Sequence, residues 1–320
     1  MSQYENRPLS AIPSLQDTRD YTVAMFTPVI TDFPPEHLVE KPPSIYDQGQ
    51  TSMCVAYSLA ALKEQHEYKE RGTRMRYSPG FIYGNRKPTD YQGEGMHPRE
   101  ALANLVESGV CTYEELLGTG PYSACKAWVE WLPRRVREKA KDQRILSYVR
   151  AYTDNEIKTM LTTMGPVALT IAVYPSFFHP PGGIVSVVQP DESIQGYHEM
   201  LIVGWKRIKG KEYWVVHNSW GTAWGDAGRC YIPAGYQGIT ECWGVTDMGA
   251  AMNRDIEMDC TPVIIPPGRI TVPVRYIVEA LGGTAKWDND SKTATFIVPS
   301  NGKTVTFELQ YGSKILKIRS

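Results

Sequence analysis

The sequence predicts an α+β protein in which a helical half precedes a β-rich half. Segments rich in helix-forming residues follow one another from Cys54 to residue 165. From residue 167 the apolar residues come in short runs that are typical of buried strands. Helices followed by strands favour an α+β domain with a cleft between its two halves.

Helices are expected throughout the first half. The first, Cys54–Arg71, contains no Gly or Pro, ends at Gly72 and is apolar nearly all round in its first part, which indicates burial. The second, Pro98–Ser108, begins with a proline, which suits the first helical position. Its apolar stripe belongs in the core more readily than on a binding surface. Two further helical segments are expected at 133–143 and 154–164.

The second half is expected to begin with strands at 167–174, 200–203 and 213–216. Apolar residues on both sides of a turn at 206–211 predict an antiparallel hairpin there. Prolines recur through residues 1–44, so this segment is expected to be loop-like.

The end of the chain has a different character from the rest. A helix at 274–281 and a hairpin of strands 293–298 and 303–309 predict a small α/β module, with a turn at residues 300–302. The expected organisation is an N-terminal arm at 1–40, a main domain at 41–252, a Pro-rich linker at 253–268 and the C-terminal module at 269–320.

Composition excludes several classes of function. The formal net charge of −1 and the mixed charges give no sign of nucleic-acid or membrane-surface binding. No stretch approaches the ~18 apolar residues of a transmembrane helix, and the N-terminus lacks the basic and apolar regions of a signal peptide. The six cysteines form no CxxC pair and no Cys/His cluster with zinc spacing. Neither a metal, a cofactor nor a disulfide scaffold is therefore expected.

The most informative stretch precedes the first predicted helix. Gln48 lies six residues before Cys54, where that helix begins. Helix N-termini favour the thiolate form of cysteine, which is the nucleophile, and a nearby side-chain amide can hold a developing oxyanion. The alternative is a buried structural cysteine, because a free cysteine often acts as a small hydrophobe.

A histidine and an asparagine flank the predicted hairpin. His198 begins one strand and Asn218 ends the other, and the midpoint of their positions falls in the turn between them. They are therefore expected to lie opposite or nearly opposite each other, with Cβ atoms roughly 4.5–5.5 Å apart if directly paired. Cys54, His198 and Asn218 would then supply nucleophile, base and orienting group. Taken singly, His198 is more simply a satisfied polar residue at a strand end, and Asn218 is more simply a turn residue.

These residues resemble a known family. The stretches 48–58 and 213–232, the second with its Asn-Ser-Trp-Gly motif, resemble the active-site segments of papain-like cysteine peptidases, over residues 40–250. The resemblance implies two lobes, the left helical and the right β-rich. It implies that Cys54 is the nucleophile, His198 the general base and then acid, and Asn218 the group that orients His198. Gln48 and the backbone N–H of Cys54 would form the oxyanion hole.

The resemblance also implies substrate-binding positions. Trp220 would shield the bond between Asn218 and His198 from water. Gly93 and Gly95 are assigned the backbone role of a Cys-Asn-Gly-Gly segment that this chain lacks. Asp247 falls near a specificity position and hints at a basic P2 residue. Residues 93–122 look more like bacterial members, and the loop departs from the family pattern at Thr51, Met53 and Val55.

The N-terminal arm leaves two alternatives open. It is shorter than most propeptides of this family. Residues 1–30 either cross the cleft and restrain activity, as a propeptide does, or form a strap packed on the back of the domain. Loss of the arm would change turnover only in the first case.

The tail beginning at Gly268 resembles the stalk or copper amine oxidase N-terminal-like module of bacterial surface proteins. Copper is not implied, because residues 261–320 contain no His, Cys or Met, the ligands that copper prefers. Basic residues exceed acidic ones there, so contact of residues 269–320 with a cell-surface polymer or a protein is expected, with a purely structural role as the alternative. Localisation stays open, since the module suggests the cell surface whereas no signal peptide is visible.

The expected function is that of a thiol endopeptidase acting on peptides or proteins. An acyl transferase or amidase with the same triad is a second hypothesis, and a catalytically silent surface or assembly protein is a third. Gln48 together with the Asn-Ser-Trp-Gly motif favours peptide hydrolysis, and the retention of all four polar site groups argues against a silent protein.

Overall fold

The structure, a computed structural model, divides into two compact units, Met1–Gly249 and Ala250–Ser320. In the first unit it describes residues 4–18, 20–86, 93–116 and 133–246. In the second it describes residues 263–265, 269–271, 284–288, 290–291, 293–300, 303–310 and 316–319.

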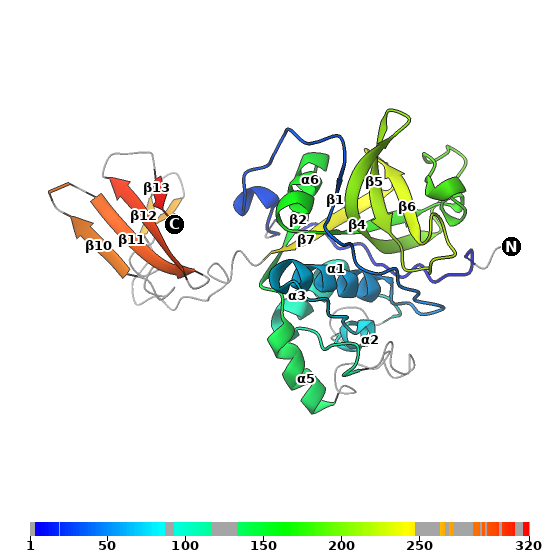
Figure 1. The fold of residues 1–320 in the computed structure, drawn as a ribbon, viewed down its shortest axis with the longest axis horizontal. Coiled ribbons are helices and arrows are strands. Elements are labelled where there is room, and N and C mark those ends of the chain that lie inside the picture. The colour runs from blue at the N-terminus through cyan, green and yellow to red at the C-terminus, as the bar shows by residue number, and fades with distance from the viewer. Residues whose placement is uncertain are drawn as a thin grey trace. The chain divides into compact units, whose positions relative to one another are not determined.

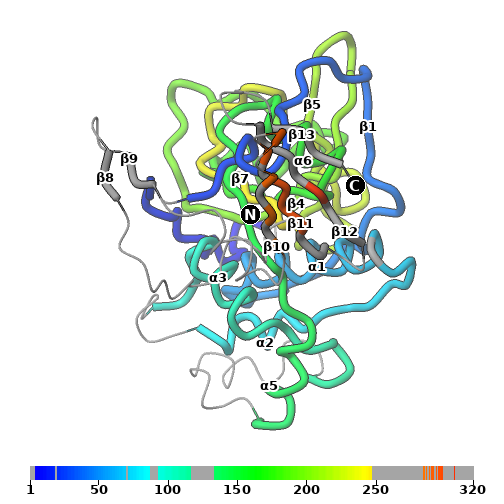
Figure 2. The backbone as a smooth tube through the Cα atoms, turned by 90° about the vertical axis from the view of Figure 1, so that its left-hand side faces the viewer, coloured from blue at the N-terminus to red at the C-terminus, as the bar shows by residue number. Residues whose placement is uncertain are grey.

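Helices form one half of the first unit. α1 (Cys54–Arg71) spans 18 residues and ends at Gly72, whose left-handed backbone closes the helix. α2 (Pro79–Gly84) and α3 (Pro98–Ser108) both begin with a proline. α5 (Arg134–Ala140) continues into a short 3-10 turn. Figure 1 shows α2, α3 and α5 on the side of α1 that faces away from the sheet, and Figure 2 shows α2 and α5 there after a 90° turn.

An antiparallel sheet forms the other half. Its strands are β1 (His37–Leu38), β2 (Ser147–Ala151), β3 (Val167–Val173), β4 (Gly196–Ile208), β5 (Lys211–His217), β6 (Arg229–Pro233) and β7 (Ile239–Thr246). Their order is β2-β7-β3-β4-β5-β6, and β1 pairs with β4 off this path. α1 packs on β4, where Ser58 Oγ donates to the carbonyl of Met200 at 2.8 Å. α6 (Asp154–Thr163) lies between β2 and β3 in the chain and starts with a capping box.

The predicted division into a helical and a β-rich half is correct with one exception. β2 lies inside the segment that the sequence predicts to be helical, because its residues pair with β7, which follows much later in the chain. The hydrogen bonds that make it a strand come from this distant partner, so the local pattern gives no sign of them. β6 and β7 are two further strands beyond those expected from the sequence. The helices at 98–108, 133–143 and 154–164 and the strand at 167–174 agree with the prediction to within a few residues.

The second unit contains a four-stranded antiparallel sheet and a separate pair of strands. The sheet has the order β10 (Thr284–Asp288), β11 (Thr293–Ser300), β12 (Lys303–Gln310) and β13 (Leu316–Arg319), and the pair is β8 (Val263–Ile265) with β9 (Arg269–Thr271). The predicted hairpin is confirmed, since β11 and β12 pair as far as Ser300 opposite Lys303. The helix predicted at 274–281 lies outside the described residues.

The second half of α1 buries charged side chains. Glu64 is fully buried, and its two oxygens accept hydrogen bonds from the Tyr46 hydroxyl (2.7 Å) and from Arg74. Lys63 and Glu67 are also buried and pair with each other. Buried charges need a partner and hydrogen bonds to be tolerated. These contacts therefore tie residues 46 and 74 to the helix that carries Cys54.

The substitution Glu64→Ala would leave Arg74 and the Tyr46 hydroxyl without their buried acceptor. We expect the free energy of unfolding to fall by about 3 kcal/mol, measured by denaturant titration of the full chain. The control is Glu138→Ala, which breaks an exposed pair with Arg134 and should cost less than about 1 kcal/mol. Equal losses in the two variants would contradict this account of α1.

Candidate active site

Cys54 is the first residue of α1, at the boundary between the helices and the sheet. No side chain caps this helix start. The first backbone N–H groups of α1 therefore lie at the Cys54 end of the helix without a side-chain acceptor. Thr51 closes the preceding loop by donating from N (3.2 Å) and Oγ1 (2.6 Å) to the carbonyl of Gln48. Gly49 supplies the left-handed backbone, φ 58°, that this tight loop requires. The loop therefore keeps Gln48 at the end of α1 where Cys54 lies.

His198 lies near the start of β4 and bonds to Asn218, the residue that follows β5. The distance from Nε2 to Asn218 Oδ1 is 2.7 Å. Because the Ser219 N–H also donates to this oxygen at 2.7 Å, the oxygen is the acceptor and Nε2 carries the proton. Nδ1 then holds the lone pair, and it has no hydrogen-bond partner in the described part of the chain. His198 thus has the tautomer of a general base.

The hairpin register differs by two residues from direct opposition. The hairpin closes with Ile208 opposite Lys211, past the expected midpoint, and a bulge in β4 between Ile202 and Gly204 shifts the pairing back by one residue, so that Leu201 pairs with His217. Asn218 therefore comes next to Met200 and stands diagonally from His198. Diagonal positions on one face of a sheet lie roughly 7–8 Å apart, a gap that two long polar side chains can span.

A hydrogen-bond chain joins this pair to Gln48. Ser219 Oγ donates to Gln48 Oε1 (2.6 Å), and the Gln48 N–H donates to the Ser219 carbonyl (2.8 Å). Gln48 Nε2 donates to the carbonyl of Thr51 at 2.9 Å, which uses one of its two protons. The amide is thereby oriented, and its second N–H is available to a developing oxyanion. Ser219 thus joins the candidate site residues, although the sequence gives no sign of these contacts beyond its place in the Asn-Ser-Trp-Gly motif.

Trp220 covers one face of His198. The two ring centroids are 4.9 Å apart, and Trp220 is buried. Phe177, Phe178 and Trp224 pack around the indole. This aromatic cluster excludes water from the side of the imidazole that it covers, which is the position expected of a shielding residue.

Burial favours the neutral form of two neighbouring residues on β4. It lowers the pKa of His198 to about 4, against the hydrogen bond to Asn218, and the charge of Arg7 adds to the lowering. Burial also raises the pKa of the Glu199 carboxyl well above its ordinary value, although a hydrogen bond from Thr170 opposes the shift. The strand thus presents a neutral imidazole next to a carboxyl that favours its protonated form.

The N-terminal arm crosses this site. Ser10 Oγ lies 3.4 Å from Cys54 Sγ, within hydrogen-bond distance for sulfur. The next residue, Ala11, donates its N–H to the carbonyl of Tyr197 (3.2 Å), the neighbour of His198. One short segment therefore contacts both the helix of the thiol and the strand of the imidazole, and Cys54 and His198 are each 0% exposed. Figure 1 shows the start of the chain, in dark blue, passing between the helices and the sheet.

The arm also pairs with the segment that contains Gly95. The Ile12 N–H donates to the Met96 carbonyl (2.9 Å), and the Met96 N–H donates to the Ser10 carbonyl (3.2 Å). Gly95 has φ 119°, and a Cβ at this residue would lie 2.4 Å from the Ser10 oxygen. Only glycine permits this approach, so Gly95 lies where a chain occupying the site must pass.

The other predicted substrate-binding positions have different outcomes. Gly93 is exposed, and its carbonyl accepts a hydrogen bond from Arg86 at 3.0 Å. The same guanidinium holds the carbonyl of Gly95 at 3.0 Å, so Arg86 supports the segment that the arm contacts. Asp247 lies outside the described residues, and the basic P2 preference stays a prediction.

Three other cysteines in the described part of the chain fit the alternative of a structural thiol. Cys111, Cys230 and Cys242 are free and buried. Burial raises the pKa of each, that of Cys111 to about 12, and so keeps them protonated. Cys54 differs from these three because it begins a long helix and its sulfur lies 3.4 Å from the Ser10 hydroxyl of the arm.

The described residues contain no group of three or more His, Cys, Asp and Glu side chains that could hold a metal ion. None of their helices combines the length and the apolar character that crossing a bilayer requires.

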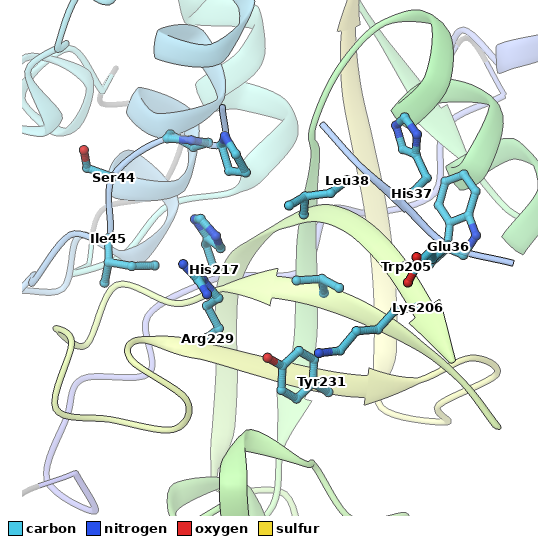
Figure 3. Close-up of a pocket in the computed structure, with 13 residues that line it drawn as sticks. Glu36, His37, Leu38, Ser44, Ile45, Trp205, Lys206, His217, Arg229 and Tyr231 are labelled. Carbon is cyan, nitrogen blue, oxygen red and sulfur yellow. The ribbon is translucent and has the colours of Figure 1, made fainter. Parts of the chain in front are cut away.

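A cavity of about 760 Å³ opens between residues 36–45 and strands β4, β5 and β6 (Figure 3). Lys206 Nζ lies 3.8 Å from the ring centre of Tyr231, and His217 and Arg229 also line this cavity. Gln48, Cys54 and His198 are not among the described residues that line it. The cavity is therefore distinct from the surroundings of the thiol.

Comparison with known proteins points to one family for the first unit. Residues 39–250 match the family model described as papain family cysteine protease, and residues 251–319 match that of the copper amine oxidase N-terminal domain. A cysteine protease of Blomia tropicalis is 24% identical over 202 residues, covering 61% of this chain and 59% of the relative. Cysteine proteinase 3 of Entamoeba histolytica is 28% identical over 187 residues, with 57% and 56% covered. The chain thus spans little more than half the length of these curated relatives.

Solved structures have the same fold. Xylellain, a cysteine protease from Xylella fastidiosa, is 23% identical with a TM-score of 0.65 over 75% of this chain and 96% of that chain. Procathepsin B S9 from Trypanosoma congolense is 19% identical with a TM-score of 0.61, covering 76% and 86%. The predicted two-lobed α+β fold and both predicted resemblances are confirmed. The attachment role of residues 269–320 and the localisation stay predictions.

Release of the arm should change the titration of His198. The arm contributes both burial and the charge of Arg7, so we expect its release to raise the pKa of His198 from about 4 toward the ordinary value of 6.5. The test uses the full-length chain with a site-specific protease sequence inserted between the exposed residues Leu15 and Gln16. This variant is folded first and then cut, and the released segment is removed; we refer to the product as the cleaved-arm form.

The titration is followed by NMR of the histidine ring protons, with His198→Gln for assignment. The midpoint for His198 should rise by about one pH unit or more on cutting. His217 is the control, because burial and the charge of Arg229 lower its pKa to about 4 without a contribution from the arm. Equal midpoints for His198 before and after cutting would show that the arm does not set its environment.

Proposed function

Because the chain belongs to the papain family of cysteine proteases, we propose that it hydrolyses peptide bonds with Cys54 as nucleophile and His198 as acid–base group. The observation that carries this proposal is the hydrogen-bond chain from Gln48 through Ser219 and Asn218 to His198. This chain of hydrogen bonds connects Gln48, proposed to hold the oxyanion, with His198, proposed to move the proton. It lies at the end of α1 that carries the Cys54 thiol.

In the proposed reaction the Cys54 thiol transfers its proton to His198 Nδ1. The thiolate attacks the carbonyl carbon of the scissile peptide, and the charge on its oxygen is stabilised by Gln48 Nε2–H and the Cys54 N–H. The imidazolium then gives its proton to the leaving amine, and a thioester to Cys54 remains. Water that loses a proton to His198 attacks the thioester, which releases the carboxylic acid and restores the thiol.

Asn218 and Trp220 act through His198. A neutral amide oxygen fixes the tautomer of the imidazole without adding a charge beside it. The indole limits the access of water to the imidazole. Both are positioning residues, because neither touches the reacting atoms in this mechanism.

Under this proposal the described form is latent. Ser10 lies against Cys54 where a scissile carbonyl would have to stand, and it presents a hydroxyl group to the sulfur. The charge of Arg7 disfavours the imidazolium that the reaction needs. Of the two alternatives for the arm, these contacts favour the one in which it crosses the cleft.

Loss of the oxyanion donor should slow the proposed reaction strongly. In the cleaved-arm form, we expect Gln48→Ala to lower kcat/KM for a fluorogenic peptide by about 10²–10³. The matched control is Gln50→Ala, an exposed glutamine of the same loop, which should leave turnover within about twofold. Cys54→Ala should abolish both turnover and labelling by a thiol-directed epoxide. Near-normal turnover by Gln48→Ala would count against the proposed mechanism.

Cutting the arm should activate the chain. We expect turnover to rise at least about tenfold when the folded variant is cut after Leu15 and the segment is removed, because substrate and arm compete for the same place. The uncut variant carrying the same insertion is the control. Unchanged turnover would favour the strap alternative. Mass spectrometry of the products, with and without an added amine, separates hydrolysis from acyl transfer, since only transfer links the amine to the acyl product.

A further inference from the structure

Arg7 of the arm is bound as a ligand would be. Its Nη1 donates to Asp47 Oδ1 and to the Gly49 carbonyl, each at 2.7 Å. Its side chain is only 9% exposed. A carboxylate and a carbonyl that converge on one guanidinium nitrogen accept both of its N–H donors, and the carboxylate complements its charge.

Asp47 and the Gly49 carbonyl lie in the loop that contains Gln48. The contacts that hold them in this loop come from outside the arm. Asp47 Oδ1 also accepts the Gly49 N–H at 2.9 Å, and the backbone of Asp47 pairs with that of Trp220. Asp47 packs so closely on Gly221 that a Cβ there would lie 3.0 Å from Oδ2. None of these contacts involves the arm. The carboxylate is therefore held in place before any ligand arrives.

The carboxyl group of Asp47 also favours its charged form, which binding to a guanidinium requires. Burial alone would raise its pKa, but the hydrogen bonds from Arg7 and from the Gly49 N–H outweigh this effect and hold the pKa below its ordinary value. The Gly49 N–H persists without the arm. Arg7 itself leaves its buried Nε without a partner, so a different arginine-bearing chain can match or improve on its fit.

The position of these acceptors is on the path of a peptide through the site. Along the arm, Tyr4 stacks on Trp220 with ring centroids 6.2 Å apart, Arg7 bonds to Asp47, and Ser10 contacts Cys54. Three residues span at most about 10 Å when extended. A peptide whose scissile bond lies at the thiol therefore passes Asp47 within a few residues.

We propose that Asp47 and the Gly49 carbonyl form a guanidinium subsite that selects an arginine side chain of the peptide substrate, and that Arg7 fills this subsite in the latent form. The inference rests on the proposed function and adds the chemical class of substrate. An arginine fits because one terminal nitrogen of its charged group offers two N–H donors to these two acceptors. Substrate and arm then compete for the same charged contact as well as for the thiol.

The first test measures cleavage. The cleaved-arm form is given pairs of internally quenched peptides that differ only by arginine against citrulline, which has a similar shape but no charge, at each position in turn. At one position we expect kcat/KM to be about 10- to 100-fold higher for arginine. In Asp47→Asn this ratio should fall close to one, whereas Asp142→Asn, an exposed aspartate elsewhere, should preserve it. A ratio near one at every position, or a ratio that survives Asp47→Asn, overturns the proposal.

The second test measures binding and does not require turnover. A synthetic peptide of residues 4–12 and its Arg7→citrulline version are titrated calorimetrically into the cleaved-arm form carrying Cys54→Ala. We expect the citrulline peptide to bind at least about tenfold more weakly. Equal affinities overturn the subsite whether or not peptides are hydrolysed. Arginine-dependent binding with no hydrolysis of any peptide by the wild-type thiol supports the subsite and counts against the proposed function.

Discussion

The hydrogen bonds between Gln48 and Ser219 set the geometry on which the rest of the site depends. Gln48 precedes α1 and Ser219 follows β5, so the helical half and the sheet meet at this pair. Each residue contributes both its backbone and its side chain to the contact. Since Cys54 follows one partner in the chain and Asn218 directly precedes the other, a shift in this pair would move the proposed nucleophile relative to the group proposed to orient the base.

The candidate site residues stand out in the sequence because each lies at the end of an element with a clear local pattern. Cys54 begins a helix without Gly or Pro, and His198 and Asn218 lie at the ends of two apolar segments around one turn. The register differs from direct opposition because the turn lies at Lys209 and Gly210, past the expected midpoint at residue 208, and the bulge in β4 shifts the pairing back by only one residue. β2 was missed because its hydrogen bonds come from β7.

The sequence alone could not decide between the two alternatives for the arm. Arg7 and Ser10 lie in a segment with no helical or strand periodicity, and their neighbours in the chain give them no special character. Their importance comes from Asp47 and Cys54, about forty residues away in sequence. A segment of this kind fits a strap and a cleft-filling arm equally well until its contacts are known. The reason for a glycine at position 95 also appears only in the structure, because a Cβ there would collide with the Ser10 carbonyl.

The covalent connection of the arm has a consequence of its own. A tethered segment is present at its site at an effective concentration of roughly millimolar, so contacts too weak to hold a free peptide are enough to keep the site filled. Leu15, just beyond these contacts, is 82% exposed. A single chain break there would free the arm from its covalent connection, and the arm would then dilute into the surrounding volume. The fraction of sites filled by the segment would then depend on the concentration of the segment. Its release would be irreversible in a large volume and reversible in a small one.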